Sequence, residues 1–126
     1  MFKDTQAFSS FSTDDIPKAK DFYAQTLGLS VSDDQGLLTL HIAGGGHILI
    51  YPKTHHTPAT FTVLNFPVEN IEQALEDLTE RGVRFEIYNA GDTKTDEKGI
   101  FRYGSIKQAW FKDPGGNVLS VIEAGE

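Results

Sequence analysis

The sequence predicts an α+β domain made of two β-α-β-β-β modules in tandem, forming a curled mixed sheet around a cup. Two observations lead to this prediction: an internal repeat, and β-prone segments separated by helix signals and glycine-rich turns. At 126 residues the chain has the length of one domain with a sizeable core. We expect a single domain over residues 1–126, with module one at about 1–54 and module two at about 58–126.

The internal repeat consists of two matched blocks that occur in the same order in each half. The pattern F-x-x-x-x-I-x-x-A-x-D over residues 11–21 returns as F-x-x-x-x-I-x-x-A-x-E over residues 66–76. Further along, GGHILI at 45–50 is matched by GGNVLS at 115–120. Two such matches are hard to obtain by chance in so short a chain, so the halves are predicted to be homologous modules.

Each module begins its helix with a capping residue and ends it with glycine. Asp15 can cap the first helix, Pro17 suits its first turn, and Gly28 can adopt the left-handed conformation that stops it. In the second module Asn70 can cap and Gly82 can terminate the helix. We therefore expect one helix per module, packed on the sheet through an apolar stripe.

Strands are expected where Val, Ile, Leu and aromatic residues concentrate between turn signals. The glycine-rich segments 43–46 and 113–116 are predicted to be the tight turns of two hairpins. The expected strands cover residues 6–12, 37–42 and 47–51 in module one, and 60–68, 85–88, 106–111 and 117–122 in module two.

The composition argues against two classes of partner. The formal net charge is −7, whereas proteins that bind nucleic acid or anionic membranes concentrate Lys and Arg on one face. There is no cysteine, and the residues from Met1 onward offer no apolar stretch of the length that a signal peptide or membrane span needs. We expect a cytoplasmic protein with a small-molecule ligand, and neither a nucleic acid nor a membrane partner.

Several of these segments together resemble a known family. The pattern of Asp15-Ile16, Ala19, Phe22-Tyr23 and Leu27-Gly28-Leu29, followed by the DPGGN turn at 113–117, is similar to the vicinal oxygen chelate superfamily, which includes glyoxalases, bleomycin resistance proteins and extradiol dioxygenases. The resemblance spans nearly the whole chain. It implies two modules curled into a cup around a small-molecule site, where many members bind a divalent metal. The fold alone leaves the function open.

The metal ligands that the resemblance implies are missing from this sequence. In the family they are His, Glu or Gln on the first and last strand of each module, and these positions fall here on Phe8, Ile50, Val63 and Ser120. Three of these side chains have no lone pair to donate, and a serine hydroxyl is a poor ligand for zinc, nickel or iron. Shifting the alignment by one residue does not restore the set. We expect no metal and no cofactor.

The four histidines offer few alternatives. His55 and His56 lie in the linker, where exposed polar residues are usual. A hairpin centred on Gly44 would place His41 and His47 opposite each other, whereas a tighter turn on Gly44-Gly45 would point them to different faces. A cup-facing His41 is the one candidate for a catalytic acid or base.

Strand alternation predicts the residues that line the cup, because residues of the same parity point the same way. The lining is mostly apolar with a few hydroxyls, which suits a flat organic molecule, although the same side chains could simply fill the core. On the strand before the last turn, either Gln108 with Trp110 or Ala109 with Phe111 would also line the cup, depending on the register of the hairpin. The predicted ligand-binding residues are Phe8, Ser10, Ile48, Ile50, Val63, Gln108, Trp110, Val118, Ser120 and also Ile122.

The segment 89–99 is too polar to be part of the hydrophobic core. It is either a solvated loop or a lid that brings neighbouring side chains to a ligand. The candidates near a ligand are Tyr88, Asp92, Asp96, Lys98 and Arg102. The segment 96–98 could instead lie at a dimer interface, and we expect a homodimer because an open cup leaves sheet edges exposed.

Three classes of function remain open. The leading hypothesis is a metal-independent small-molecule-binding protein that holds an apolar or aromatic ligand. The alternative is a glyoxalase-like lyase or a dioxygenase with a divalent metal at noncanonical ligands such as His41. An interaction module would be favoured only if bulky side chains fill the cup. No nucleophile has an evident base, and the Gly44–Gly46 run precedes a strand, so it is no phosphate-binding loop.

Overall fold

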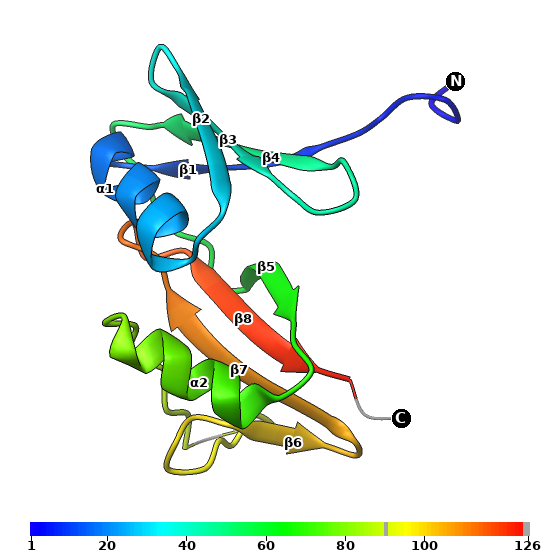
Figure 1. Cartoon of the computed structure of the whole chain (residues 1–126), viewed down its shortest axis with the longest axis vertical. Coiled ribbons are helices and arrows are strands. Elements are labelled where there is room, and N and C mark those ends of the chain that lie inside the picture. Colours follow the sequence, from blue (N-terminus) through cyan, green and yellow to red (C-terminus); the bar gives the residue numbers. More distant parts are fainter. Residues whose placement is uncertain (90, 125–126) are drawn as a thin grey trace. The chain divides into compact units, whose positions relative to one another are not determined.

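The computed structural model describes residues 1–89 and 91–124. The chain divides into two compact units, Met1–Thr57 and Pro58–Glu126. Each unit contains a four-stranded mixed sheet and a helix from the same half of the chain (Figure 1). The predicted α+β fold class with two tandem modules is therefore confirmed; the two sheets are separate and neither is closed. Within the described residues, no helix has the length and apolar character needed to span a membrane.

The first unit has the strand order β1-β4-β3-β2, with β1 parallel to β4 and the other pairs antiparallel. Its helix begins where predicted, since the Asp15 side chain accepts a hydrogen bond from the backbone N–H of Lys18 at 3.0 Å. Gly28 has φ of +75° and ends the helical segment. The elements are β1 (Ser9–Thr13), α1 (Ile16–Asp21), the π-helical turn η1 (Phe22–Thr26), β2 (Ser30–Asp34), β3 (Leu37–His41) and β4 (His47–Pro52).

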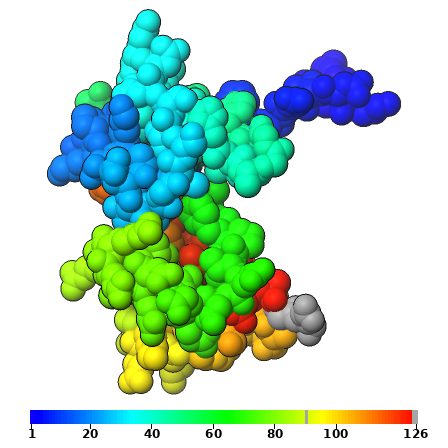
Figure 2. Space-filling model, in the orientation of Figure 1, coloured from blue at the N-terminus to red at the C-terminus, as the bar shows by residue number. Residues whose placement is uncertain are grey.

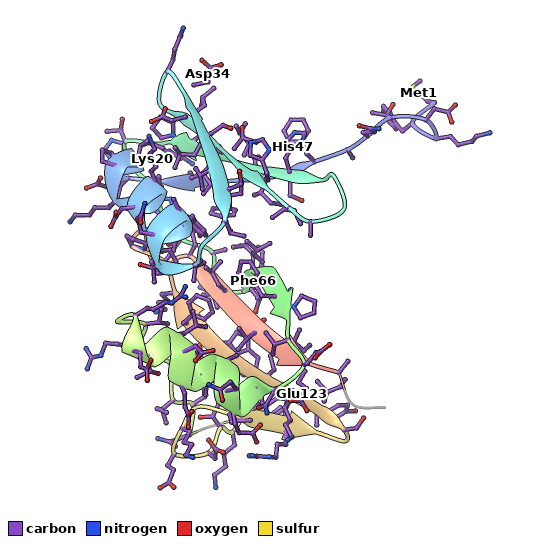
Figure 3. The ribbon with its side chains drawn as sticks, in the orientation of Figure 1. Met1, Lys20, Asp34, His47, Phe66 and Glu123 are labelled. Carbon is purple, nitrogen blue, oxygen red and sulfur yellow. The ribbon has the colours of Figure 1, made fainter. Side chains whose placement is uncertain are left out.

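The second unit repeats this arrangement with the order β5-β8-β7-β6, in which β5 runs parallel to β8. Asn70 caps the helix by accepting from the N–H of Gln73 at 3.0 Å. The N–H of Ile71 donates to the carboxylate of Glu123 at 2.9 Å, which ties the end of β8 to the helix start (Figure 3). The elements are β5 (Thr62–Pro67), α2 (Ile71–Glu80), β6 (Phe101–Tyr103), β7 (Ile106–Lys112) and β8 (Val118–Glu123).

Each sheet buries the face that its helix covers. In the first unit Tyr23 and the strand residues Leu38, Leu40 and Ile50 are fully buried. In the second unit the residues of β7 and β8 on the helix side are buried together with Ile71 and Leu75 of α2. Figure 2 shows the second unit from the helix side, where the atoms of α2 and β5 cover much of the sheet. The opposite face of the second sheet is only partly buried, with Val118 and Ser120 of β8 as its buried residues.

The turn between β7 and β8 is held by a buried carboxylate. Oδ1 of Asp113 accepts from the N–H groups of Gly115 at 3.0 Å and Asn117 at 2.9 Å, while Oδ2 accepts from Asn117 Nδ2 at 3.0 Å. Gly116 has φ of +85°, and a Cβ at that position would lie 3.1 Å from Cγ of Pro58. The DPGGN sequence thus forms the predicted turn. Its aspartate supplies the hydrogen bonds that hold the turn, and its second glycine supplies the positive φ and leaves room for Pro58.

The strands differ from prediction at two places. Residues 85–88 form no strand but only an isolated bridge between Phe85 and Phe111, together with a hydrogen bond from Glu86 N to Trp110 O at 2.8 Å. The strand that lies at the edge of β7 is β6, which pairs with residues 106–108. In the first unit β2 was missed, because SVSDD is a polar edge strand without apolar alternation.

The turn between β3 and β4 adopts the arrangement centred on Gly44. His41 pairs directly with His47, and the N–H of Ile42 donates to the carbonyl of Gly46 at 2.9 Å. Gly44 and Gly45 both have positive φ, +94° and +97°, which the four-residue AGGG segment permits. The two histidines therefore lie on the same face of the first sheet.

Candidate functional site

The face of the second sheet opposite α2 carries most of the predicted ligand-binding residues of this unit. Trp110 pairs with Ser120, and Gln108 pairs with Ile122, so these side chains share a face with Val118 two residues from Ser120. Of the two hairpin alternatives, the structure has the one with Gln108 and Trp110 on this face. Ala109 and Phe111 are fully buried on the helix side.

Trp110 lies at the centre of an aromatic group on this face. Its indole Nε1–H donates to the hydroxyl of Thr62 at 3.0 Å, which fixes the ring orientation. The ring centroids of Tyr88 and Phe101 lie 5.7 Å and 5.8 Å from that of Trp110. Tilted aromatic pairs at this separation attract each other and keep the rings in place.

A hollow of about 350 Å³ opens beside Trp110. Its walls combine three aromatic rings with threonine hydroxyls, and Phe61 at its edge is 69% exposed. This volume is within the range of small-molecule sites, and the lining is of mixed polar and apolar character. The lining residues are Thr60, Phe61, Thr62, Tyr88, Thr93, Trp110 and Val118.

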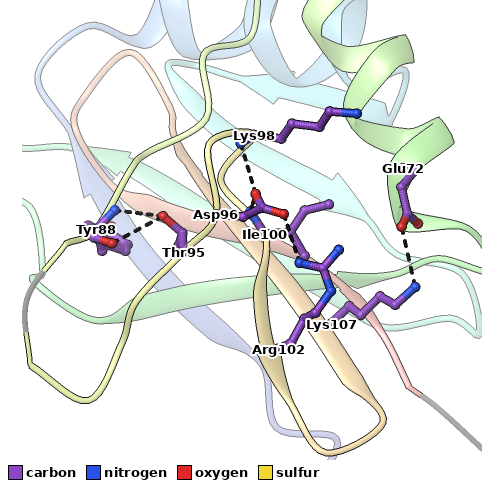
Figure 4. Close-up of polar contacts among 8 residues, drawn as sticks. All are labelled: Glu72, Tyr88, Thr95, Asp96, Lys98, Ile100, Arg102 and Lys107. Carbon is purple, nitrogen blue, oxygen red and sulfur yellow. Dashed lines mark hydrogen bonds and ion pairs between the residues drawn. The ribbon is translucent and has the colours of Figure 1, made fainter.

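The segment before β6 positions Tyr88 in this hollow. The backbone N–H of Tyr88 donates to Thr95 Oγ1, and the N–H of Thr95 donates to the carbonyl of Tyr88, both at 2.9 Å (Figure 4). Burial raises the pKa of the Tyr88 phenol, and the charge of Glu86 adds to the effect. Tyr88 therefore stays a neutral phenol at neutral pH and can donate a hydrogen bond to a ligand.

A second group of contacts holds the end of the same segment. The Asp96 carboxylate accepts from the N–H groups of Lys98 and Ile100, both at 2.9 Å, and from Arg102 Nη1 at 2.8 Å (Figure 4). Burial acts to raise the pKa of Asp96, but these hydrogen bonds outweigh it and hold the pKa below its usual value. Asp96 and Arg102, both candidates from the sequence, are thus paired with each other.

Polar side chains from three strands meet on this face next to Trp110. Ser120, which is fully buried, donates to Oδ1 of Asn65. Gln108 Nε2 donates to Ser120 Oγ at 3.1 Å and to Asn65 Oδ1 at 3.3 Å. The predicted residues Gln108 and Ser120 are therefore brought together by Asn65, which the sequence analysis missed.

Val63, in contrast, does not take the position predicted for it. The register of β5 shifts between Thr62 and Leu64, so that Val63 lies at an irregularity and has no partner on β8. Thr62 pairs with Val118 and Asn65 with Ser120, which puts these two polar side chains on the face where valine was expected. A β-bulge interrupts the alternation of side chains between the two faces of a strand. Asn65 was the one sign of it in the sequence, because asparagine is uncommon inside strands.

In the first unit the predicted lining residues are divided between two faces. Phe8 and Ser10 point to the same face as His47 and Leu49. Ile50 pairs with Phe11 and points to the helix side, where Phe11 contacts Tyr23. The expectation that Ile48 and Ile50 point the same way as Phe8 and Ser10 is therefore wrong, because β1 and β4 are in a register offset by one residue. Ile50 is fully buried in the core.

Phe8 nevertheless lies beside a small hollow in this unit. Its ring stacks on His47 with the centroids 4.7 Å apart, and a hollow of about 280 Å³ is lined there by Phe8, His47 and Ile48 among others. Ser10 is exposed and does not line it. The aromatic walls here are fewer than in the second unit.

His41 has a partner that occupies one of its ring nitrogens. Its Nε2 lies 2.6 Å from Ser32 Oγ on the neighbouring strand. His56 Nδ1 likewise lies 2.7 Å from Ser12 Oγ. Across the described ranges 1–89 and 91–124, no three or more His, Asp or Glu side chains are grouped as a metal ion requires. The side chains do not fit the divalent metal that the family resemblance implies.

A larger hollow, about 460 Å³, lies between α2 and residues 98–100. Its floor is Leu75 and Ile100, and its rim carries Lys98 together with the helix residues Glu72, Glu76, Thr79 and Glu80. Its lining includes no aromatic ring, and none of the predicted ligand-binding residues lies in it. Of these two hollows, only the smaller one beside Trp110 is lined by aromatic rings on which a planar ligand can stack.

Comparison with known proteins agrees with this fold. The sequence profile of the Glyoxalase/Bleomycin resistance protein/Dioxygenase superfamily matches residues 7–121. The chain belongs to this superfamily. The resemblance found in the sequence is confirmed, and it extends over both modules of this glyoxalase-superfamily protein.

Solved structures of the superfamily show the same fold. A glyoxalase family protein from Bacillus anthracis aligns with a TM-score of 0.70 at 18% identity, covering 93% of this chain and 92% of its own. An antibiotic-binding protein from a Streptomyces species aligns with a TM-score of 0.69 at 23% identity over 99% of both chains. A glyoxalase/bleomycin resistance protein from the same species has 25% identity and a TM-score of 0.63, covering 93% of this chain and 98% of its own. A search of curated protein sequences gives no significant match.

Proposed function

We propose that this superfamily member is a metal-independent binding protein for a small, flat aromatic molecule. The observation that carries the proposal is the hollow beside Trp110, whose walls are formed by Phe61, Tyr88 and Trp110. A planar ring can stack on Trp110 and Tyr88 with little loss of conformational freedom, since Thr62 holds the Trp110 indole and Thr95 holds the backbone of Tyr88.

The relatives support the class of ligand. One neighbour of the same fold is an antibiotic-binding protein, and another is a glyoxalase/bleomycin resistance protein. Antibiotics of this kind are organic molecules of a size that a hollow of about 350 Å³ could hold in part. We therefore propose that the ligand is an aromatic antibiotic or a comparable aromatic metabolite.

The donor set supports the proposal of metal independence. The face around Trp110 offers hydroxyl, amide and indole groups, of which none is a strong ligand for a divalent transition metal. The enzyme alternative depends on His41, and this side chain is paired with Ser32 in a different unit of the chain. Binding is thus favoured over lyase or dioxygenase chemistry.

Fluorescence of Trp110 provides a direct test, because it is the only tryptophan in the chain. We expect aromatic ligands to quench or shift this emission in a saturable way. The Phe61→Ala variant should bind about tenfold more weakly, since it removes one aromatic wall of the hollow.

Tyr103→Ala serves as the matched control. Tyr103 is an aromatic residue of the same unit, 72% exposed and therefore similar to Phe61, but it does not line the hollow. Its replacement should leave the affinity within about twofold of the wild-type value. Equal losses in both variants, or no saturable change of emission with any aromatic compound, would contradict the proposal.

A further inference from the structure

The polar cluster of Asn65, Gln108 and Ser120 leads from the interior of the second unit to its surface. Ser120 is fully buried, Gln108 is half-buried and Asn65 is exposed. The three side chains come from β5, β7 and β8, and all lie on the face that carries Trp110. The cluster is thus adjacent to the aromatic hollow without being part of its lining.

The hydrogen bonds within the cluster leave two groups unused. Oδ1 of Asn65 accepts from both Ser120 and Gln108, and the Nε2 of Gln108 donates to both of its neighbours. Among the residues that the structure describes, neither Nδ2 of Asn65 nor Oε1 of Gln108 has a partner. One donor and one acceptor therefore remain available on the surface.

The presence of one free donor and one free acceptor does not depend on the orientation of the two side-chain amides. If both amides are turned over, Ser120 donates to Gln108 Oε1, and Asn65 Nδ2 donates to Ser120 and Gln108 in turn. The unused groups are then Oδ1 of Asn65 and Nε2 of Gln108. Turning only one amide would bring two donors or two acceptors together, which is unfavourable. In both consistent arrangements the surface presents one donor and one acceptor.

We propose that this cluster binds a neutral amide group on the ligand, so that the preferred ligands are aromatic carboxamides or lactams. The inference rests on the proposed function, because the amide would be attached to the ring that occupies the hollow beside Trp110. An amide supplies a carbonyl for the free donor of the cluster and an N–H for its free acceptor.

A carboxylate would fit this cluster poorly. All three side chains are uncharged, and a carboxylate oxygen placed near the free acceptor would be repelled. The nearby cations are already paired, since Arg102 binds Asp96 and Lys112 lies 3.6 Å from Glu86. The cluster therefore selects a neutral group with a donor and an acceptor over an anion of the same shape.

A pair of probes with the same ring and shape tests this selection. The dissociation constants of 2-naphthamide and 2-naphthoate are measured by ligand-observed NMR titration of the full chain at neutral pH. We expect the wild-type protein to bind the amide about tenfold more tightly than the carboxylate, which corresponds to one well-formed additional hydrogen bond.

Variants of the cluster identify the residues responsible. Asn65→Ala and Gln108→Ala each remove one of the two outward groups, and each should reduce the preference for the amide to about twofold. Gln25→Ala, an exposed amide of the first unit, is the control and should keep the full preference. The ratio of the two affinities is the readout, since a general loss of packing would lower both values together.

The outcomes distinguish this inference from the proposed function. If both naphthyl probes bind with equal affinity and Phe61→Ala weakens both, the aromatic site stands and the role of the cluster in selection is overturned. If the wild-type protein binds neither probe nor any other aromatic compound, the proposed function fails and this inference fails with it. A preference that survives in both cluster variants would also overturn it.

Discussion

At the scale of single residues, the orientation of Trp110 depends on one hydrogen bond. Thr62→Val removes the acceptor of the indole N–H while it keeps the shape of the side chain. We predict a loss of about 1 kcal/mol in the free energy of unfolding, because a half-buried donor is left without a partner. Urea denaturation followed by Trp110 emission measures this loss. Thr60→Val, at a hollow-lining threonine, is the control and should cost less than half as much.

Asp113, in the turn between β7 and β8, and Asp33, beside the turn between β2 and β3, allow a second comparison between residues of the same type. Asp113 is buried and accepts two backbone N–H groups and the side chain of Asn117, whereas Asp33 is exposed and its carboxylate accepts the N–H of Gly36 and lies 3.6 Å from Lys20 Nζ. Asp113→Ala should therefore cost about 3 kcal/mol and Asp33→Ala about 1 kcal/mol. Thermal or urea unfolding of both variants gives the comparison. A smaller loss for Asp113→Ala than for Asp33→Ala would contradict the role assigned to the buried turn.

Much of the residue-level chemistry could be predicted from the sequence, but only where it is local. The caps at Asp15 and Asn70 and the glycine stops at Gly28 and Gly82 depend on neighbours a few positions away, and all four are observed. Asn65 could not be found, because its position on the ligand face depends on a bulge in β5 and on partners more than 40 residues away.

At the scale of elements, the segment from Tyr88 to Ile100 is predicted to respond to acid through Asp96. The pKa of this carboxyl group in the folded protein lies below the ordinary value of 3.8. Its hydrogen bonds therefore contribute stability at pH values above 3.8, and this contribution is lost as the pH falls through the lower folded-state pKa. We expect the protection factors of the Lys98 and Ile100 amide protons, which compare the observed exchange rate with the intrinsic rate at the same pH, to fall once Asp96 is protonated.

Hydrogen exchange followed by NMR between pH 2 and pH 6 measures this response. The Asp96→Asn variant should have low protection factors for these amides throughout the range, with no further decrease as the pH falls. Asp92→Asn, which changes an exposed carboxylate of the same segment, is the control and should behave as the wild type. If Asp96→Asn keeps the wild-type profile, another group controls the segment.

The elements that the sequence failed to predict are those with weak apolar patterns. Residues 85–88 are rich in aromatic and β-branched side chains, yet their backbone forms only one bridge with β7, since β6 takes the other part of that edge. The short strand β6 and the polar strand β2 lie at sheet edges, where one side needs no partner and hydrophobic alternation is weak.

At the scale of the whole molecule, the internal repeat and the DPGGN turn were enough to predict the fold class and the family. The function depends on which side chains occupy the open face of each sheet, and this requires the register of the strands. The one-residue offset between β1 and β4 moved Ile50 from the predicted site into the core, which a sequence pattern cannot foresee.

The oligomeric state is a further prediction at this scale. We expect a homodimer, because β1 and β2 end one sheet and β5 and β6 end the other, which leaves backbone groups available for pairing. Light scattering coupled to size-exclusion chromatography should then give twice the chain mass of 13.9 kDa. A mass of one chain at tens of micromolar protein would contradict this expectation.

The central claim is that an aromatic ligand binds at Trp110 without a metal. The most direct test is isothermal titration calorimetry, in which an aromatic compound that binds is titrated into the purified protein. The titration is done first in EDTA and then with added zinc, nickel, manganese or iron. We predict one ligand per chain in EDTA and affinities within about twofold when a metal is present. Binding that appears only after a metal is added would contradict it and would favour glyoxalase or dioxygenase chemistry.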